Sequence, residues 1–500
     1  MNNNRNKWCY TAGCTGRDLT YTLVSLFFLT YIQYTNLLNT NQFVVLSVII
    51  VLCRVWDAVN DPMMGTIISN TKSRFGKYRP WVLIGCVINC VFLILMFTAR
   101  VEVNDTNIDK LGWYNVAILG VSYLLWGMSF TMNDVSFWSI LPTLAKEKKE
   151  RDNLTTMLAV FASVGAFAAG GLVPMLTPGN MIVAYRVISI VFSLVFLGCQ
   201  IMVFFCVHDN EKDKFRLDAD EVLFNKEDNI TIKDMVKILA RNNQLLVMAV
   251  VFLLTSLGGA ILNAFGQNFF YFKYGYNGNQ MFIFTVMYAL GTIISQLSYP
   301  ILASKFKRNQ ILSVAIMLIA LGYISFFSLA NVNLGGTLGF AILCFFGVLI
   351  FVGQGVFYMA QLVMLTNTIE YDEWKTGKRN DAVTFSVRPF MVKLAGAIQY
   401  LVVSITLVVC GLYDITQQVG KVEQQIAQGE ETKEAGVLLI EQLLSSATSG
   451  QMIGLTASMT LLPVIFYIVS YVIIKKKYII DEDLYETMIK EISERKDVSL

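Results

Sequence analysis

The chain has 500 residues, of which 55% are hydrophobic and 15% are charged, and its formal net charge is +3. Soluble domains carry roughly 25% charged residues, so the composition excludes a soluble body of this length. The mean hydropathy of +0.55 indicates a membrane protein instead. The small net charge gives no indication that nucleic acid is a partner.

Apolar residues recur in runs of about 20 residues or more, which is the length of helix that crosses roughly 30 Å of hydrocarbon. Because lipid offers the backbone no hydrogen-bond partners, these runs are expected to be helices. Twelve spans are predicted in chain order, with turn-forming Asn, Gly and Pro between several of them. Their approximate bounds are 12–37, 42–69, 81–99, 112–141, 154–176, 182–207, 240–273, 280–303, 310–330, 336–367, 382–413 and 449–474.

Basic residues recur in alternate connections between the predicted spans. They are Lys72, Arg74, Lys77 and Arg79; Lys146, Lys148, Lys149 and Arg151; Lys305, Lys307 and Arg308; Lys375, Lys378 and Arg379; and Lys475, Lys476 and Lys477. Connections such as 38–42 and 177–180 carry none. The positive-inside rule places the basic connections in the cytoplasm. Both termini of a multi-pass protein of the cell membrane are therefore expected inside.

Two long charged connections organise the chain. The first, 208–239, begins at the only histidine, His208, which is expected at the membrane edge. The second, 414–448, is expected outside the cell with a short helix over 431–444. The predicted parts are a six-helix bundle over 1–207, a cytoplasmic linker over 208–239, a second six-helix bundle over 240–474 with the external loop 414–448, and a cytoplasmic tail over 475–500. Basic loops after the second and eighth spans are typical of a transporter with two pseudo-symmetric bundles around a central cavity.

Several ionisable residues fall inside predicted spans. They are Asp18, Asp57, Asp61, Asp134 and Lys393, with Arg17, Arg54 and Arg388 as secondary cases. A charged side chain near the bilayer centre costs at least about 2.5–3.5 kcal/mol, so such residues persist where they face a cavity and are paired. At about 1.5 Å of rise per residue, all five lie at depths that one shared polar cavity would explain.

Asp57 and Asp61 are four residues apart, so they project from one helix face. Two close carboxylates repel each other, and either a small cation between them or a proton on one of them relieves the repulsion. The amide of Asn60 and the hydroxyl of Thr131 add oxygen atoms of the kind that hard cations prefer. No cofactor is expected beyond the transported Na⁺ or H⁺. An alternative interpretation is a helix-end cluster of ion pairs with Arg54 and the basic loop.

Trp138 follows Asp134 by four residues and shares its helix face. Carboxylates accept hydrogen bonds from sugar hydroxyls, and an aromatic face covers the C–H surface of a sugar ring. The pair therefore predicts a sugar site. Alone, Trp138 is equally well interpreted as a belt residue at the inner membrane interface.

Three stretches resemble one family. They are RVWDAVNDPMMGTIISNTKSRFGKYRPW from Arg54, WGMSFTMNDVSFWSILPTL from Trp126, and IEYDEWKTGKRNDAVTFSVRPFMVK from Ile369. They are similar to the second helix, the fourth helix, and the tenth-to-eleventh loop with the eleventh helix of the glycoside–pentoside–hexuronide:cation symporters, which belong to the major facilitator superfamily. The sequence RDL at 17–19 matches the start of that family's first helix. The resemblance covers nearly the whole chain.

The resemblance implies a role for each matching position. Asp57, Asn60, Asp61 and Thr131 would form the cation site, and Asp18, Asp134 and Trp138, with Arg17 beside them, would bind the sugar. Lys393 would balance the acidic cluster when no cation is bound. The loop after the second span would act as an inner gate through Arg74, Gly76, Lys77 and Arg79, with Arg54 near it.

The sequence departs from the melibiose permeases of that family at three positions of the sugar cavity. Ala159 stands for an arginine, Tyr358 stands for a tryptophan, and Arg388 stands for a neutral residue. Arg388 favours an acidic sugar such as a hexuronide, or it forms a structural ion pair with Glu370 or Glu373.

The predicted function is cation-coupled import of a sugar or glycoside by alternating access, with the lipid bilayer as surroundings. The alternatives are a symporter of an acidic sugar or of a lipid-like solute, and a membrane receptor that binds sugar without moving it. An enzyme is not expected, because the sequence shows no nucleophile–base set and no cluster of metal ligands.

Overall fold

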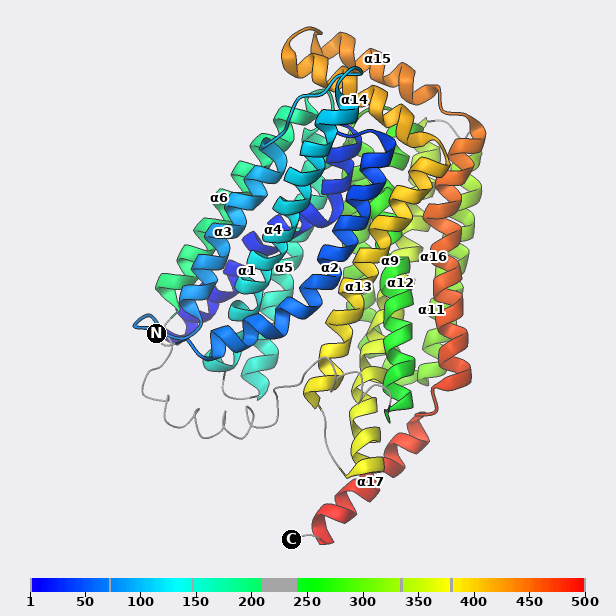
Figure 1. Cartoon of the computed structure of the whole chain (residues 1–500). Helices are drawn as coiled ribbons and strands as arrows, with labels where there is room; N and C mark the ends of the chain where they lie inside the picture. Colours follow the sequence, from blue (N-terminus) through cyan, green and yellow to red (C-terminus); the bar gives the residue numbers. More distant parts are fainter. Residues whose placement is uncertain are drawn as a thin grey trace. The chain divides into compact units, whose positions relative to one another are not determined.

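The computed structural model describes residues 2–71, 73–145, 148–207, 241–332, 336–377 and 381–498. Within these ranges the regular elements are all helices (Figure 1). They are α1 (Asn2–Gln33), α2 (Thr40–Ser69), α3 (Arg79–Thr98), α4 (Ile108–Leu144), α5 (Lys148–Leu176), α6 (Met181–Cys206), α9 (Asn243–Tyr274), α10 (Asn279–Lys305), α11 (Arg308–Asn331), α12 (Gly336–Thr376), α13 (Asp381–Val409), α14 (Leu412–Gln428), α15 (Lys433–Ser445), α16 (Ser449–Lys477) and α17 (Glu482–Val498). The predicted linker 208–239, with His208, lies outside the described residues.

Eleven of the described helices are long and apolar enough to cross a membrane. They are α2 to α6, α9 to α13 and α16. With 32 residues α1 is also long enough, but it begins with a polar stretch and carries Arg17 and Asp18 in its interior, so its composition is less apolar. With α1 as the twelfth helix, the all-α fold with twelve spans is the one that the sequence predicts.

Contacts between Cα atoms group the chain into two units. Unit 1 comprises Met1–Asp220, Gly266–Thr285 and Tyr400–Gln451, and unit 2 comprises Glu221–Phe265, Val286–Gln399 and Met452–Leu500. Two short segments of the second predicted bundle therefore belong to unit 1 by their contacts. The division into bundles at 1–207 and 240–474 stays a prediction.

Within unit 1, α1 lies against α5 and α6 at unusually short range. A Cβ atom at Gly165 of α5 would lie 2.2 Å from the carbonyl oxygen of Thr15, and one at Gly16 would lie 2.8 Å from the Cα atom of Phe196 in α6. The side-chain amide of Gln200 donates a hydrogen bond of 2.9 Å to the carbonyl of Gly13. Backbones that pack through glycine in this way fix a helix firmly, so the charged residues of α1 have a defined position.

The region predicted as an external loop holds two helices. α15 matches the short helix predicted over 431–444, but α14 was not predicted, and the eleventh span ends at Val409 rather than at 413. The chain turns at Gly411, whose φ of 67° is the left-handed conformation that glycine adopts without strain. Sequence reasoning missed α14 because its residues are mostly polar, although it buries one face that includes Leu412, Tyr413 and Val419.

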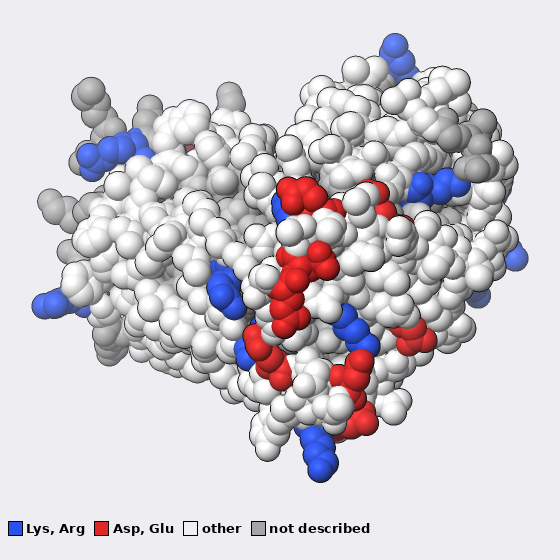
Figure 2. All heavy atoms as spheres, turned by 90° about the horizontal axis from the view of Figure 1, so that it is seen from above, with Lys and Arg blue, Asp and Glu red and all other residues white. Residues whose placement is uncertain are grey.

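The end of unit 1 that carries α14 and α15 is rich in exposed carboxylates. Figure 2 views the molecule from above and shows Asp and Glu side chains gathered in a broken line on this face. The exposed acidic residues of α14, α15 and their connection include Asp414, Glu430, Glu434 and Glu441.

In unit 2, the predicted tail 475–500 contains α17, which packs on the end of α12. The indole Nε1 of Trp374 donates a hydrogen bond of 2.7 Å to Glu491, and Arg495 donates one of 2.7 Å to the carbonyl of Trp374. Tyr371, Ile480 and Met488 form a buried cluster beneath these bonds.

Candidate functional site

Arg17 of α1 is the centre of the sugar-site residues that the sequence predicts. Its side chain is 5% exposed, and its Nη1 donates a hydrogen bond of 2.8 Å to Oδ1 of Asp134 on α4. Its Nη2 donates one of 3.0 Å to Oδ2 of Asp18. A buried guanidinium bonded to two carboxylates satisfies both of them, so one cation holds the acidic residues of two helices together.

The two carboxylates remain accessible while the arginine does not. The side chains of Asp18 and Asp134 are 25% and 34% exposed. Trp138 is 39% exposed, and its Nε1 donates a hydrogen bond of 3.1 Å to Oδ1 of Asp134. The guanidinium of Arg17 lies 5.3 Å from the centre of the Trp138 ring. The arrangement presents carboxylate oxygens beside an exposed aromatic face, which is the combination that binds a polyhydroxylated ring.

Asp61 of α2 is held by α4 near this cluster. The hydroxyl of Thr131 donates a hydrogen bond of 3.0 Å to Oδ1 of Asp61. Asn60 is 2% exposed, and its Nδ2 has no hydrogen-bond partner. Asn60 and Asp61 on α2 and Thr131 on α4 each carry a side-chain oxygen atom. The cation site predicted from these residues and Asp57 stays a prediction.

Asp57 has a different environment from Asp61. Its Oδ2 lies 3.9 Å from Nη1 of Arg54, and both side chains are less than 8% exposed. A Cβ atom at Gly127 of α4 would lie 2.8 Å from Oδ1 of Asp57, so glycine leaves the room that this carboxylate occupies. The two carboxylates share a helix face; Asp57 contacts Arg54, and Asp61 accepts a hydrogen bond from Thr131.

Arg54 lies inside a box of aromatic rings rather than in the basic loop. Its guanidinium is 5.7 Å from the centre of the Tyr21 ring, 5.5 Å from that of Tyr123 and 5.7 Å from that of Trp126. Its Nη1 also donates a hydrogen bond of 3.4 Å to the hydroxyl of Tyr21. A cation enclosed by aromatic faces is stabilised by their quadrupoles. The gating role predicted for Arg54 stays a prediction.

A single stripe on α4 connects the two sets of residues. Gly127, Thr131, Asp134 and Trp138 are spaced by four, three and four residues, so they share one face of the helix. Thr131 and Asp134 are separated by a rise of about 4.5 Å along the axis. The candidate cation residues and the candidate sugar residues are thus one helical turn apart.

The loop between α2 and α3 is fastened to its own unit. Nε of Arg79 donates a hydrogen bond of 2.8 Å to the carbonyl of Phe204 at the end of α6. Gly76 has a φ of 94°, which requires glycine. Arg74 is exposed, with its guanidinium 4.7 Å from the Phe75 ring, and Lys77 lies 5.5 Å from the Tyr78 ring. The gating role of these residues stays a prediction.

Three predicted site residues belong to unit 2. Arg388 of α13 donates a hydrogen bond to the hydroxyl of Tyr358 on α12, and its guanidinium lies 5.4 Å from the centre of that ring. Lys393 is half-buried on α13. Its predicted bridge to the acidic residues of unit 1 stays a prediction.

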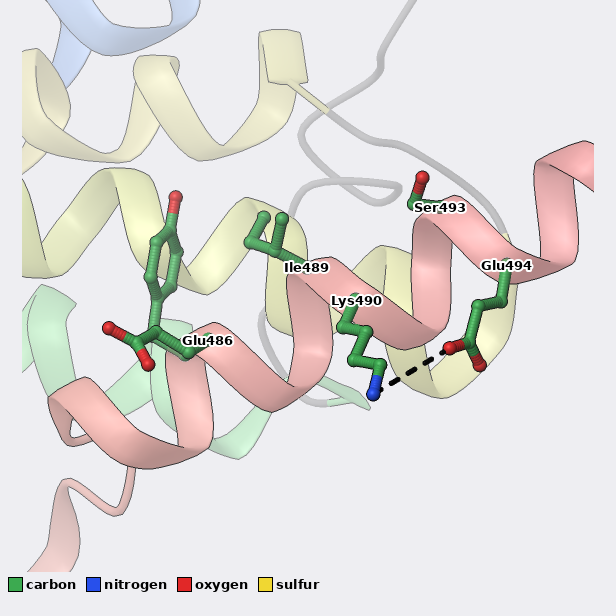
Figure 3. A pocket seen from close by; sticks show the side chains of 6 residues that line it. Glu486, Ile489, Lys490, Ser493 and Glu494 are labelled. Atoms are coloured by element: carbon green, nitrogen blue, oxygen red, sulfur yellow. Dashed lines mark ion pairs between the residues drawn. The ribbon is translucent and has the colours of Figure 1, made fainter.

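A hollow on the surface of α17 is unrelated to these residues. Figure 3 shows it from close by, with Glu486, Ile489, Lys490 and Ser493 along one side of the helix. The ion pair drawn there joins Lys490 to Glu494 at 4.0 Å, with both side chains largely exposed. Within the described ranges no group of three or more His, Cys, Asp or Glu side chains gathers as a metal site.

Sequence reasoning missed four residues that shape the site. They are Cys14, Tyr21, Tyr123 and Gly127. Cys14 accepts a hydrogen bond of 3.2 Å from Arg17 and donates one of 3.2 Å to Asp18. The signal for Cys14 and Tyr21 was their spacing, since they lie four residues before and three residues after Asp18 on the same helix face.

A helical membrane protein that pairs charged side chains inside its spanning helices, with two of the carboxylates partly exposed, has the architecture of a transport protein. The profile of the family described as MFS/sugar transport protein matches residues 9–482. The chain belongs to that family. This confirms the resemblance and the multi-pass helical membrane fold.

Two relatives support the same assignment, and one solved structure shares the fold. The chain is 29% identical over 415 residues to the lactose permease of Lactobacillus delbrueckii subsp. bulgaricus, covering 81% of the chain and 63% of the relative. It is 27% identical over 418 residues to the raffinose carrier protein of Pediococcus pentosaceus, covering 81% and 62%. The chain thus spans less than two thirds of either relative. A bacterial homologue of the human lysosomal transporter Spinster shares the fold, with a TM-score of 0.63 at 10% identity over 96% of the chain and 99% of that structure.

Proposed function

We propose that the chain is a cation-coupled symporter that imports a sugar or glycoside by alternating access. The relatives named as lactose and raffinose carriers support the solute class, although they are longer than this chain. The observation that carries the proposal is the α4 stripe, on which Thr131 bonds to Asp61 and Asp134 bonds to Arg17 and Trp138.

This arrangement supports coupling between ion and solute. A cation bound at Asp61 and Thr131 would fix the rotation and position of α4 one turn from Asp134. The solute would then meet a carboxylate that is already in place, so it would bind better to the cation-loaded form. By linkage, the cation would bind better to the solute-loaded form by the same factor.

The solute itself is held by this chain's own groups. Asp134 and Asp18 would accept hydrogen bonds from sugar hydroxyls, and Trp138 would cover one face of the ring. Arg17 orients both carboxylates, because its guanidinium bonds to each of them.

The coupling ion is Na⁺ or H⁺. Oxygen atoms of Asn60, Asp61 and Thr131 suit Na⁺, because hard cations prefer such ligands. A proton on Asp61 would instead keep the bond from Thr131 and remove the charge. Uptake with and without Na⁺ at fixed pH, and then at varied pH without Na⁺, separates the two.

An acidic sugar is a second candidate solute. Arg388 is exposed, and its bond to Tyr358 holds the guanidinium against the aromatic ring. A cation at that place could pair with the carboxylate of a uronide. Competition of labelled lactose uptake by lactose, by raffinose and by a glucuronide distinguishes the neutral solute from the acidic one.

We also propose that the end of unit 1 carrying α14 and α15 lies outside the cell, with both termini in the cytoplasm. The basic residues of the α2–α3 loop and of the end of α16 support this orientation.

Uptake by proteoliposomes tests the function. We expect purified protein to accumulate lactose or raffinose against its gradient when an inward Na⁺ or proton gradient is imposed, and the Asp61→Asn variant to lose the dependence on the ion. Equilibration without accumulation, under either gradient, would reject symport.

A further inference from the structure

α14 carries the least exposed carboxylate among the residues that the structure describes. Glu423 is 0% exposed. Its Oε1 accepts a hydrogen bond of 2.8 Å from the amide of Gly179 and one of 2.7 Å from the hydroxyl of Tyr276. Its Oε2 accepts one of 2.7 Å from the amide of Met181. Three short bonds to a buried charge fix the carboxylate in position.

The three donors come from both halves of the sequence. Gly179 lies in the turn between α5 and α6 and has a φ of 73°, and Met181 is the first residue of α6. Tyr276 lies in the connection between α9 and α10, in a segment that belongs to unit 1 by its contacts. Glu423 is therefore the point at which α14, a first-half turn and a second-half connection meet.

The docking of α14 on the first half is extensive. Tyr413 stacks on Phe43 of α2 at 4.2 Å between ring centres, and its hydroxyl donates a hydrogen bond of 3.0 Å to the carbonyl of Leu38. A Cβ atom at Gly420 would lie 2.5 Å from the amide nitrogen of Asn36, so the two backbones are in direct contact. Such a surface is costly to separate, because buried apolar and polar groups would all be exposed together.

Tyr276, by contrast, reaches Glu423 through one hydroxyl. Its ring is 2% exposed and lies 4.9 Å from the ring of Tyr271 and 6.5 Å from that of Tyr34. The backbone of Gly278 touches the first half as well, since a Cβ atom there would lie 1.8 Å from the carbonyl oxygen of Pro174. The second-half connection thus packs closely but is tied to Glu423 by a single directional bond.

We propose that Glu423 is the acceptor of an outer latch: α14 stays on the first half throughout the transport cycle, and the Tyr276 hydroxyl binds Glu423 when the outer side is closed and leaves it when that side opens. The latch rests on the proposed function, because it has a use only in a protein that opens alternately to the two sides of a membrane. The latch lies outside the candidate solute and cation residues, with its acceptor on α14, the helix that follows the eleventh span.

Burial and the neighbouring groups shift the pKa of Glu423 in opposite directions. Burial raises the pKa of Glu423, and the bonds from Tyr276, Met181 and Gly179, together with the charge of Lys433 on α15, lower it. Tyr271 of α9 is the other titratable group that faces it. Because the bond from Tyr276 lowers the pKa of Glu423, that bond favours the ionised carboxylate.

A reporter cysteine beneath the latch tests the proposal directly. Thr285 of α10 is 8% exposed, and its hydroxyl donates a hydrogen bond of 3.3 Å to the carbonyl of Gly170 in α5. In a Cys410→Ser background, Thr285→Cys is labelled with a membrane-impermeant maleimide applied from the outside. The labelling rate measures how often the contact between α5 and α10 opens to the outside.

We expect Tyr276→Phe to raise the labelling rate of Thr285→Cys about tenfold, which corresponds to the loss of one hydrogen bond to a charged acceptor. Glu423→Ala should raise it at least as much. The matched control is Tyr413→Phe, which removes a tyrosine hydroxyl bond between α14 and the first half, and it should label at the parental rate.

Equal labelling rates in the parent and in Tyr276→Phe would overturn the latch. The same acceleration in Tyr413→Phe would also overturn it, because general loosening of α14 would then explain both results. Labelling needs neither solute nor ion gradient, so a protein that fails to transport still reports on the latch, and failure of the latch leaves the symport proposal standing.

Discussion

Replacement of Asp134 probes how the solute is bound. Asp134→Ala removes the acceptor of the 2.8 Å bond from Arg17 and of the 3.1 Å bond from Trp138. Trp138 is exposed and its N–H can bond to water, whereas Arg17, at 5% exposure, keeps only Asp18 as a carboxylate partner among the contacts described here. We therefore expect a solute site that has lost both an acceptor and the orientation of its remaining carboxylate.

The size of the loss follows from the bond type. A hydrogen bond to a charged acceptor contributes about 1.5–3 kcal/mol, so the Kd for lactose or raffinose should rise between about tenfold and about a hundredfold. Asp134→Asn keeps one acceptor oxygen without the charge, and its Kd should rise about fivefold, since a neutral hydrogen bond contributes about 1 kcal/mol less.

The assay is equilibrium binding of labelled sugar to purified protein, with thermal unfolding as the check on folding. Trp138→Phe serves as a control, because it keeps an aromatic face and loses only the bond to Oδ1 of Asp134. Wild-type affinity in Asp134→Ala, in protein that unfolds at the wild-type temperature, would refute the assignment of Asp134 to the solute site.

Three further outcomes are expected from the same structure. Thr131→Val removes the 3.0 Å bond to Asp61 and should lower the apparent affinity for the coupling ion about tenfold, as measured by ion titration of uptake; an unchanged ion titration would contradict it. Gly127→Ala places a Cβ atom 2.8 Å from Oδ1 of Asp57 and should destabilise the protein by about 1–3 kcal/mol, seen as a lower unfolding temperature; Ala substitution at the uncrowded Gly198 is the control. Burial raises the pKa of Glu423, so the folded protein binds a proton there more tightly than the unfolded chain does. The wild-type protein should therefore gain stability as pH falls through this raised pKa toward the ordinary carboxyl range. Glu423→Gln has no proton to take up, so its unfolding temperature should not show that gain.

Much of the fold was predictable because lipid restricts the options. Long apolar runs in a membrane must be helices, and turn-forming residues separated most of them, so most helix ends lie within several residues of the predicted spans. The exceptions include the start of α1 at Asn2 and the end of α12 at Thr376. α14 was not predictable in that way. Its buried face alternates with Gln, Lys and Glu, and only contact with the first half explains why the helix is folded there.

The candidate site was predictable as far as helix periodicity reaches. The spacing of Asp57 and Asp61, and of Asp134 and Trp138, identified shared helix faces. The contacts between helices could not be read in the same way. The family resemblance implied that Arg17 lies beside Asp18 and Asp134, which helix periodicity alone did not show. Nothing in the sequence showed that Arg54 would be enclosed by Tyr21, Tyr123 and Trp126. The position of α1, and with it that of Arg17, depends on the glycines that let α1 approach α5 and α6.

Reciprocal binding in the absence of transport tests the central claim that ion and solute sites adjoin on α4. The Kd for lactose or raffinose should be measured on purified protein without Na⁺ and at saturating Na⁺, and again across pH without Na⁺. The account predicts that one of the two ions tightens sugar binding, and that Thr131→Val reduces this effect while leaving ion-free sugar affinity near the wild-type value. Sugar affinity that responds to neither ion in the wild-type protein would contradict it.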